Sequence, residues 1–145
     1  MSNRVEEPAA VYGRPGSTFQ NLLRGKGSIN SLKKGLPAES ADTLMKAYGM
    51  TQQDMADTLH TNPKTLRSKI KEHGVLDPLQ GSMIAALAEL YEKGMGLFQE
   101  KASFLQWLHF PSAALGVKPF DLLDTFQGIR LVMSELDSIS EGSFA

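Results

Sequence analysis

Helix start and stop signals recur at short intervals along this chain, and they constrain its fold more than any other feature. Gly49 stands two residues before Thr51, and threonine is a good cap for the N-terminus of a helix. Asn62-Pro63 and Asp77-Pro78 each place a capping side chain before a proline, which suits the first position of a helix. The strand-type alternation of β-branched residues is missing from the sequence. The pattern predicts an all-α fold.

Apolar residues between these signals recur at three- and four-residue spacings, as one buried helix face requires. The predicted helices span about 38–47, 51–59, 63–73, 78–98 and 101–108, and a last one runs from Thr125 to near Gly142, after an irregular stretch over 111–119. We expect Gly49 and Gly74 to end the first and third of them. The predicted core stripes are Ala41, Leu44, Met45 and Tyr48; Met55, Ala56 and Leu59; Leu66 and Ile70; Met83, Ile84, Leu87, Tyr91, Met95 and Phe98; and Ile129, Val132, Met133, Leu136 and Ile139.

Composition divides the 145 residues into three parts. Residues 1–27 contain scattered prolines and glycines with few clustered apolar residues, which is typical of a flexible arm. Residues 28–98 form the predicted first helical domain. The composition shifts again after Gly94 and Gly96, and we expect residues 99–145 to form a small second helical domain.

The second and third predicted helices have the size and spacing of a helix–turn–helix. The formal net charge of -1 argues at first against a nucleic-acid partner, but it is an average over opposed parts. Residues 61–73 sum to +3, residues 37–60 to -3, and everything after His73 to -5. The third helix is therefore a basic element in a nearly neutral chain.

Lys64, Arg67 and Lys71 lie three and four residues apart, so they share one face of this helix. Leu66 and Ile70 lie on another face, which leaves the basic face free to enter a major groove. The predicted DNA-binding residues are Thr51, Gln52, Asn62, Lys64, Thr65, Arg67, Ser68 and Lys71. A solvated basic surface is the alternative, and for Thr51 and Asn62 a role as helix caps alone.

No constellation for catalysis or metal binding is present in the sequence. The chain has no cysteine, and His60, His73 and His109 lack metal-ligand spacing. Gly25-Lys26-Gly27-Ser28 breaks the residue order of a phosphate loop. We therefore expect no enzymatic activity, no cofactor and no metal. The N-terminus has no signal-peptide pattern and no apolar run could span a bilayer, so we expect a cytoplasmic protein without a membrane partner.

The pattern of residues from Ser28 to the end resembles the Xre/MbcA/ParS antitoxins. The first half contributes Gly35-Leu36-Pro37, Leu44, Met50-Thr51-Gln52, Met55-Ala56, Leu59, Lys64-Thr65-Leu66-Arg67 and Gly74-Val75-Leu76-Asp77-Pro78. The second half contributes Trp107-Leu108, Pro111, Leu115-Gly116, Pro119, Asp121-Leu122-Leu123-Asp124-Thr125, Gly128, Val132, Leu136, Ile139 and Gly142. Two positions depart from the pattern. His60 stands where glycine is common and Thr61 where an apolar residue is common, but histidine tolerates a left-handed backbone better than most residues.

This resemblance implies an Xre-like helix–turn–helix domain followed by a toxin-binding domain. It further implies an antitoxin that neutralises a RES-domain toxin, which degrades NAD or transfers its ADP-ribose to proteins. Such an antitoxin represses its own operon by binding operator DNA as a homodimer or larger complex.

The second domain offers a set of apolar residues on a loop and at the chain end that could contact the toxin. The predicted toxin-binding residues are Phe110, Pro111, Leu115, Val117, Phe120, Ile139 and Phe144. Their neighbours Trp107, Leu108, Leu122 and Leu123 belong more naturally to the core. The negative charge of this domain suits a partner with a basic pocket.

Three functions stay open on the sequence. The first is an antitoxin that binds both toxin and operator. The second is a stand-alone dimeric helix–turn–helix repressor whose C-terminal part only dimerises. The third is a toxin-neutralising protein whose helix–turn–helix no longer binds DNA and serves assembly instead.

Overall fold

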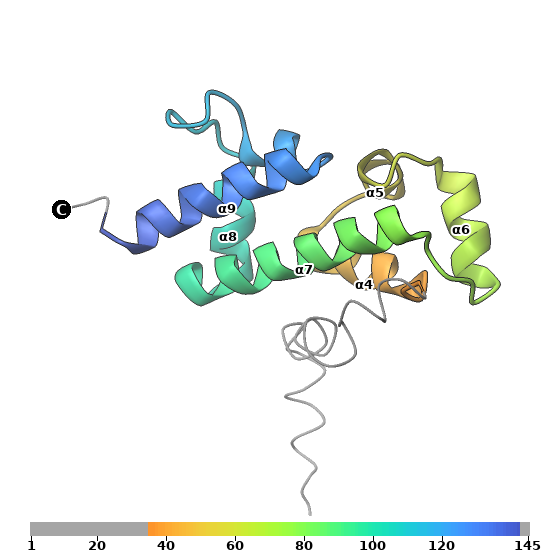
Figure 1. Cartoon of the computed structure of the whole chain (residues 1–145). Helices are drawn as coiled ribbons and strands as arrows, with labels where there is room; N and C mark the ends of the chain where they lie inside the picture. Colours follow the sequence, from red (N-terminus) through yellow and green to blue (C-terminus); the bar gives the residue numbers. More distant parts are fainter. Residues whose placement is uncertain (1–34, 143–145) are drawn as a thin grey trace, which may run out of the picture.

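A computed structural model describes residues 35–142, and this part of the chain is helical, as predicted. Within residues 35–142 six α-helices follow one another, α4 (Glu39–Tyr48), α5 (Gln52–Thr58), α6 (Pro63–Lys71), α7 (Pro78–Phe98), α8 (Lys101–Leu108) and α9 (Phe126–Ser140), with a short 3₁₀ helix, η2 (Pro119–Leu122), before the last (Figure 1). The only β contact in residues 35–142 is an isolated bridge between Pro37 and Val75. The predicted arm over 1–27 lies outside the described residues.

The caps form where the sequence predicted them. Gly49 adopts a left-handed φ of 69° and ends α4. The side chain of Thr51 accepts from the amide of Asp54, while the carboxylate of Asp54 accepts from the amide of Thr51, both at 3.0 Å. The side chain of Asn62 accepts from the amide of Thr65 at 2.9 Å. Each of these bonds satisfies a backbone group that a helix end leaves unpaired, so local chemistry sets the helix boundaries.

The predicted end of the third helix was wrong by two residues. Helix α6 ends at Lys71, and the left-handed residue after it is His73, with φ 56°, rather than Gly74. The amide of Gly74 donates to the carbonyl of Lys69 at 2.9 Å, and the amide of His73 donates to that of Ile70 at 3.1 Å. This is a Schellman-type ending in which histidine takes the place that glycine usually occupies.

Helix α7 lies at the centre of the fold and packs against α4, α8 and α9. The buried side chains of these helices form one cluster, which includes most residues of the predicted stripes. Ile70, Met95, Phe98 and Met133 are partly buried against it, Ala56 is buried, and Ile139 is half-buried. The hydroxyl of Tyr48 donates to the carbonyl of Leu87 at 2.6 Å, so its polar end is satisfied inside the core. The predicted boundary between the domains at residue 98 falls at the end of α7 and stays a prediction. No helix within residues 35–142 has the length and apolar character needed to cross a membrane.

Two glycines allow close approach of backbone and ring. A Cβ atom at Gly94 would overlap the ring of Phe104, so glycine in α7 lets α8 pack directly on it. A Cβ atom at Gly128 would overlap the carbonyl of Leu122, so glycine in α9 lets η2 close against the start of that helix. The first contact holds α8 against α7, and the second holds η2 against α9. Together they position the two ends of the segment between α8 and α9.

Candidate functional site

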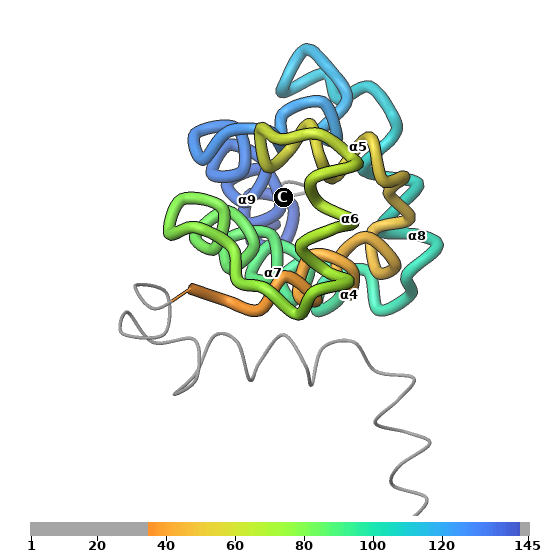
Figure 2. Tube along the Cα trace, turned by 90° about the vertical axis from the view of Figure 1, so that its right-hand side faces the viewer, coloured from red at the N-terminus to blue at the C-terminus, as the bar shows by residue number. Residues whose placement is uncertain are grey.

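Helices α5 and α6 form the predicted helix–turn–helix at one end of the molecule, and Figure 2 views that end with α6 in front. Leu66 is buried, and Ile70 is partly buried against the same core, so this face anchors α6. All eight predicted DNA-binding residues are exposed. Four of them, Asn62, Lys64, Thr65 and Ser68, line one open hollow along α6 together with Lys69 and Glu72.

The other four predicted residues are exposed but do not line this hollow. Gln52 and Arg67 are joined by a hydrogen bond from the guanidinium Nη1 to the side-chain oxygen Oε1, at 2.7 Å. The bond links the start of α5 to the middle of α6 and restricts the guanidinium, which keeps four other N–H groups for a ligand. Thr51 and Asn62 both act as caps, as the sequence predicted; a DNA contact by either stays a prediction. Lys71 is exposed at the last position of α6.

The basic side chains of α6 form no salt bridge within the described residues. The three salt bridges within residues 35–142 join Lys46 to Asp42, Lys93 to Asp137, and His73 to Glu39. None of them involves a lysine or the arginine of α6. The face that the hollow presents to solvent therefore keeps the positive charge expected from the sequence, which attracts a polyanion.

The pair of His73 and Glu39 connects the end of α6 to the start of α4. Its Nδ1 and Oε2 atoms lie 2.6 Å apart. The hydrogen bond from His73 holds the pKa of Glu39 below its ordinary value, with a further contribution from the backbone amide of Glu39 itself. Because Glu39 is the first residue of α4, its negative charge also lies at the positive end of that helix.

The turn between α5 and α6 confirms that His60 can replace glycine. His60 has a left-handed φ of 58°. The amide of Thr61 donates to the carbonyl of Ala56 at 2.8 Å, and the side-chain amide of Gln80 in α7 donates to the carbonyl of Leu59 at 3.3 Å. The imidazole Nε2 of His60 lies 2.9 Å from the carbonyl oxygen of Asp124, which precedes α9. This last contact could not be predicted from the sequence, because no local pattern pairs two residues 64 positions apart.

The second predicted site lies on the segment between α8 and α9. Phe110 is 70% exposed and Val117 41% exposed, and Pro111 is exposed as well. Leu115 and Phe120 are half-buried and pack against the core, and the ring of His109 stacks on that of Phe120 with centroids 4.4 Å apart. Ile139 is half-buried near the end of α9, and Phe144 lies outside the described residues. Leu108 and Leu123 are buried and Trp107 and Leu122 partly buried, which confirms their predicted place in the core.

The loop that carries Phe110 and Val117 is held by its own hydrogen bonds. The amide of Ser112 donates to the carbonyl of Val117 at 3.1 Å, and the hydroxyl oxygen of Ser112 accepts from the amide of Leu115 at 3.1 Å. Gly116 adopts a left-handed φ of 81° and its amide donates to the carbonyl of Ser112 at 2.8 Å. The predicted irregular stretch thus contains a closed loop that presents Val117 on a fixed backbone. Phe110 lies just before this loop, and its amide donates to the carbonyl of Trp107 at 3.3 Å.

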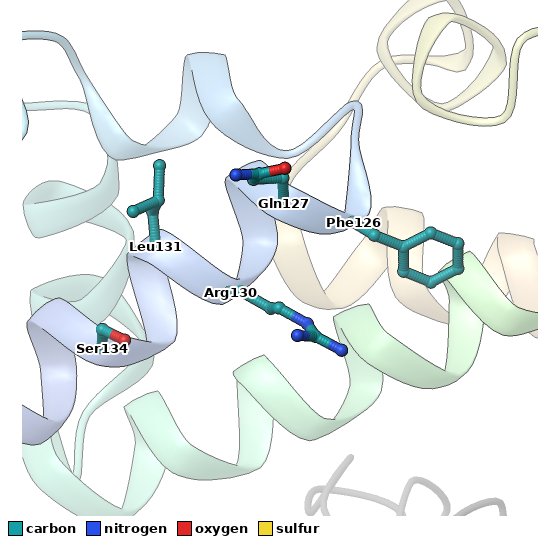
Figure 3. Close-up of a pocket in the computed structure, with 5 residues that line it drawn as sticks. All are labelled: Phe126, Gln127, Arg130, Leu131 and Ser134. Carbon is teal, nitrogen blue, oxygen red and sulfur yellow. The ribbon is translucent and has the colours of Figure 1, made fainter.

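One exposed apolar surface, on α9, is not among the predicted sites. Phe126 and Leu131 are 40% and 48% exposed. They line a shallow hollow with Gln127, Arg130 and Ser134, and Figure 3 shows all five side chains projecting from α9. The signal was present in the sequence, because Leu131 lies off the face that carries Ile129, Val132 and Leu136. No group of three or more potential metal-binding side chains gathers anywhere in residues 35–142.

The fold and the exposed basic face of α6 define a helical protein with a helix–turn–helix followed by a further helical domain. Each of these two parts matches a known protein family. Residues 29–89 match the antitoxin Xre-like helix-turn-helix domain, and residues 94–142 match the antitoxin Xre/MbcA/ParS C-terminal toxin-binding domain. Together the two matches cover about three quarters of the chain. The chain belongs to the Xre/MbcA/ParS antitoxins.

A curated relative agrees with this assignment. The Prs ADP-ribosylating antitoxin of Sphingobium sp. (strain YBL2) is 28% identical over 145 aligned positions, which cover 92% of this chain and 91% of the relative. The similarity therefore extends over both domains in the same order.

Proposed function

We propose that this antitoxin neutralises a RES-domain toxin by direct binding and represses its own operon by binding operator DNA. The observation that carries the proposal is the presence, in one chain, of a helix–turn–helix match and a toxin-binding match. Exposure of every predicted DNA-binding residue supports the DNA part. Exposure of Phe110 and Val117 supports the toxin part.

On DNA, α6 enters the major groove with the hollow lined by Lys64, Thr65 and Ser68 facing the bases and backbone. Lys64 and Lys71 contact phosphates, which position the protein without reading sequence. Arg67 is the residue best suited to a base edge, because its bond to Gln52 orients the planar guanidinium before contact. The amides at the starts of α5 and α6, beside Thr51 and Asn62, complete the phosphate contacts.

A homodimer presents two copies of α6 to the operator. Two recognition helices related by a two-fold axis read two half-sites about 34 Å apart or a multiple of that spacing. We propose this arrangement for the repressor, with the two half-sites forming an inverted repeat in the operator.

On the toxin, Phe110 and Val117 insert as apolar anchors from the hydrogen-bonded loop around Ser112. Pro111, Leu115 and Phe120 support them, and Ile139 and Phe144 contribute from the end of the chain. The fixed backbone of the loop lowers the entropy that binding has to remove. The resemblance to RES-toxin partners and the name of the Sphingobium relative both favour a toxin that acts on NAD or transfers ADP-ribose.

We further propose that the antitoxin is not an enzyme and acts in the cytoplasm, where operator and toxin are both present. Its effect on the toxin is then steric: the bound C-terminal domain blocks access to the toxin's active site.

Growth rescue tests the proposal directly. The neighbouring reading frame is expressed alone and together with this chain, and the two products are co-purified. We expect the neighbour to arrest growth, this chain to restore it, and the two proteins to purify as a complex. A harmless neighbour, or two products that never associate, contradicts the antitoxin function and leaves the stand-alone dimeric repressor. Rescue without any mobility shift of the upstream DNA at low salt leaves a toxin-neutralising protein that does not bind DNA.

A further inference from the structure

A single side chain joins the turn of the helix–turn–helix to the start of the C-terminal helix. The imidazole Nε2 of His60 lies 2.9 Å from the carbonyl oxygen of Asp124. A carbonyl oxygen only accepts hydrogen bonds, so the Nε2 atom carries the proton and donates it. The two residues are 64 positions apart, and each belongs to a different matched domain.

His60 lies in the turn just before α6, so a small displacement of its backbone moves the recognition helix. Its left-handed backbone, φ 58°, reverses the chain between α5 and α6. The amide of the next residue, Thr61, bonds to Ala56 at 2.8 Å, and Asn62 then caps α6. One residue therefore separates the histidine from the cap, so its position and that of α6 are linked through the backbone.

On the other side, Asp124 belongs to a tightly fixed corner. Thr125 follows it and caps α9 by accepting from the amide of Gly128 at 2.9 Å. Gly128 itself stands against the carbonyl of Leu122 with no space for a Cβ atom. Phe120, one of the predicted toxin contacts, lies four residues before Asp124 in the same short segment. A toxin that binds Phe120 therefore contacts the segment whose last residue, Asp124, bonds to His60.

We propose that His60 is a positioning residue that couples toxin binding to operator binding. This inference rests on the proposed function, because it needs both ligands. The bond is exposed to solvent, so in the free protein it opens and re-forms. Toxin on the loop and η2 contacts this fixed corner and keeps the carbonyl of Asp124 within reach of His60. The turn and α6 are then already ordered when DNA binds, which raises operator affinity.

The coupling is reciprocal, so operator DNA strengthens toxin binding by the same factor. Its size is limited by the net contribution of one intramolecular hydrogen bond. That contribution corresponds to roughly a two- to tenfold change in an equilibrium constant. We therefore expect saturating toxin to lower the operator Kd of the wild-type protein by a factor in this range.

The chain offers a matched pair of variants for the test. His60→Gly removes the ring and keeps a residue that adopts the left-handed backbone freely. His73→Gly also removes a ring at a position with a left-handed backbone, at the other end of α6. The side chain of His73 contacts Glu39 and not the C-terminal domain. Both variants lose an exposed histidine next to the recognition helix. Only His60→Gly loses the bond to Asp124.

Operator Kd is measured by fluorescence anisotropy on a duplex carrying the DNA upstream of the protein's own gene. Each titration is done with and without a saturating amount of the neighbouring gene's product, purified as an active-site variant. We expect the ratio of the two Kd values to fall close to one in His60→Gly and to stay at the wild-type value in His73→Gly. His60→Asn, which tolerates the same backbone but is too short to replace the ring, should behave as His60→Gly does.

Hydrogen exchange gives a second readout. Toxin should slow exchange of the amides of residues 61–66 in the wild-type protein and in His73→Gly, and leave it unchanged in His60→Gly. The inference is overturned if toxin and operator both bind the wild-type protein but the operator Kd is the same with and without toxin. It is overturned as well if toxin changes the operator Kd of His60→Gly by the wild-type factor. A third result against it would be an equal loss, in His60→Gly and His73→Gly, of the effect of toxin on the operator Kd. A wild-type protein that binds no upstream DNA, or no toxin, removes the proposed function itself and this inference with it.

Discussion

A methyl group added at Gly94 should destabilise the protein, because the ring of Phe104 fills the space where that group would stand. The ring is fully buried and cannot move aside easily. Its centroid lies 5.8 Å from that of Tyr91 and 6.2 Å from that of Tyr48, so aromatic rings enclose it. Extra atoms forced into a packed core cost about 1–3 kcal/mol. Alanine in a helix returns about 0.5–1 kcal/mol relative to glycine. We expect Gly94→Ala to lower the free energy of unfolding by about 1–2 kcal/mol.

Gly96→Ala is the matched control, two residues further along α7. Apart from its chain neighbours and the backbone of α7, a Cβ atom at Gly96 meets no atom within 4 Å, so only the helix preference changes. This variant should gain about 0.5–1 kcal/mol, and the difference between the two variants then measures the packing cost alone. Urea unfolding followed by circular dichroism gives both values. If Gly94→Ala is as stable as Gly96→Ala, Phe104 moves freely and the tight contact between α7 and α8 does not determine stability.

Three further predictions concern the two surfaces and the pH dependence of folding. Lys64→Ala should flatten the slope of log K for operator DNA against log salt by about 0.9, measured by titration at several salt concentrations, because one phosphate contact is lost. Phe110→Asp should weaken toxin binding about tenfold or more while operator binding stays unchanged, since the side chain is an exposed anchor away from α6. Glu39→Gln should destabilise the protein at neutral pH. The hydrogen bond from His73 lowers the pKa of Glu39 in the folded state from its ordinary 4.5, so this stabilisation is present above that value and is lost as the pH falls through the lowered pKa. Unfolding of wild type and variant should therefore converge in acid.

The helix boundaries could be predicted from the sequence because they depend on neighbours in the chain. Thr51, Asn62 and Asp77 each cap a helix through bonds to amides three residues on. The buried faces were predictable for the same reason, since helix geometry alone places Leu44 and Tyr48 on one side. The end of α6 was predicted at Gly74 because glycine is the commonest residue in the left-handed position after a helix, and here His73 occupies that position.

The parts that could not be predicted depend on residues far apart in the chain. The bond between Arg67 and Gln52 needs the crossing of α5 and α6, and the bond between His60 and Asp124 needs α9 to begin beside the turn. Helix η2 was missed because four residues carry too little periodic signal. Helix periodicity predicted the exposed face of Lys64, Arg67 and Lys71, but only the structure shows which of the predicted DNA-binding residues line one hollow.

Binding defects and folding defects in this protein can be separated by their magnitudes, although one core supports both surfaces. A typical domain is stable by about 5–15 kcal/mol, so a loss of about 1–2 kcal/mol in Gly94→Ala leaves nearly all molecules folded at 25 °C. Neither operator nor toxin affinity should then change measurably in that variant. It follows that a tenfold loss of one affinity in a surface variant of similar stability comes from the lost contact and not from unfolding. Gly94→Ala is therefore the reference for destabilisation without surface change, and a loss of binding in it would show that the packing of α7 on α8 shapes the surfaces themselves.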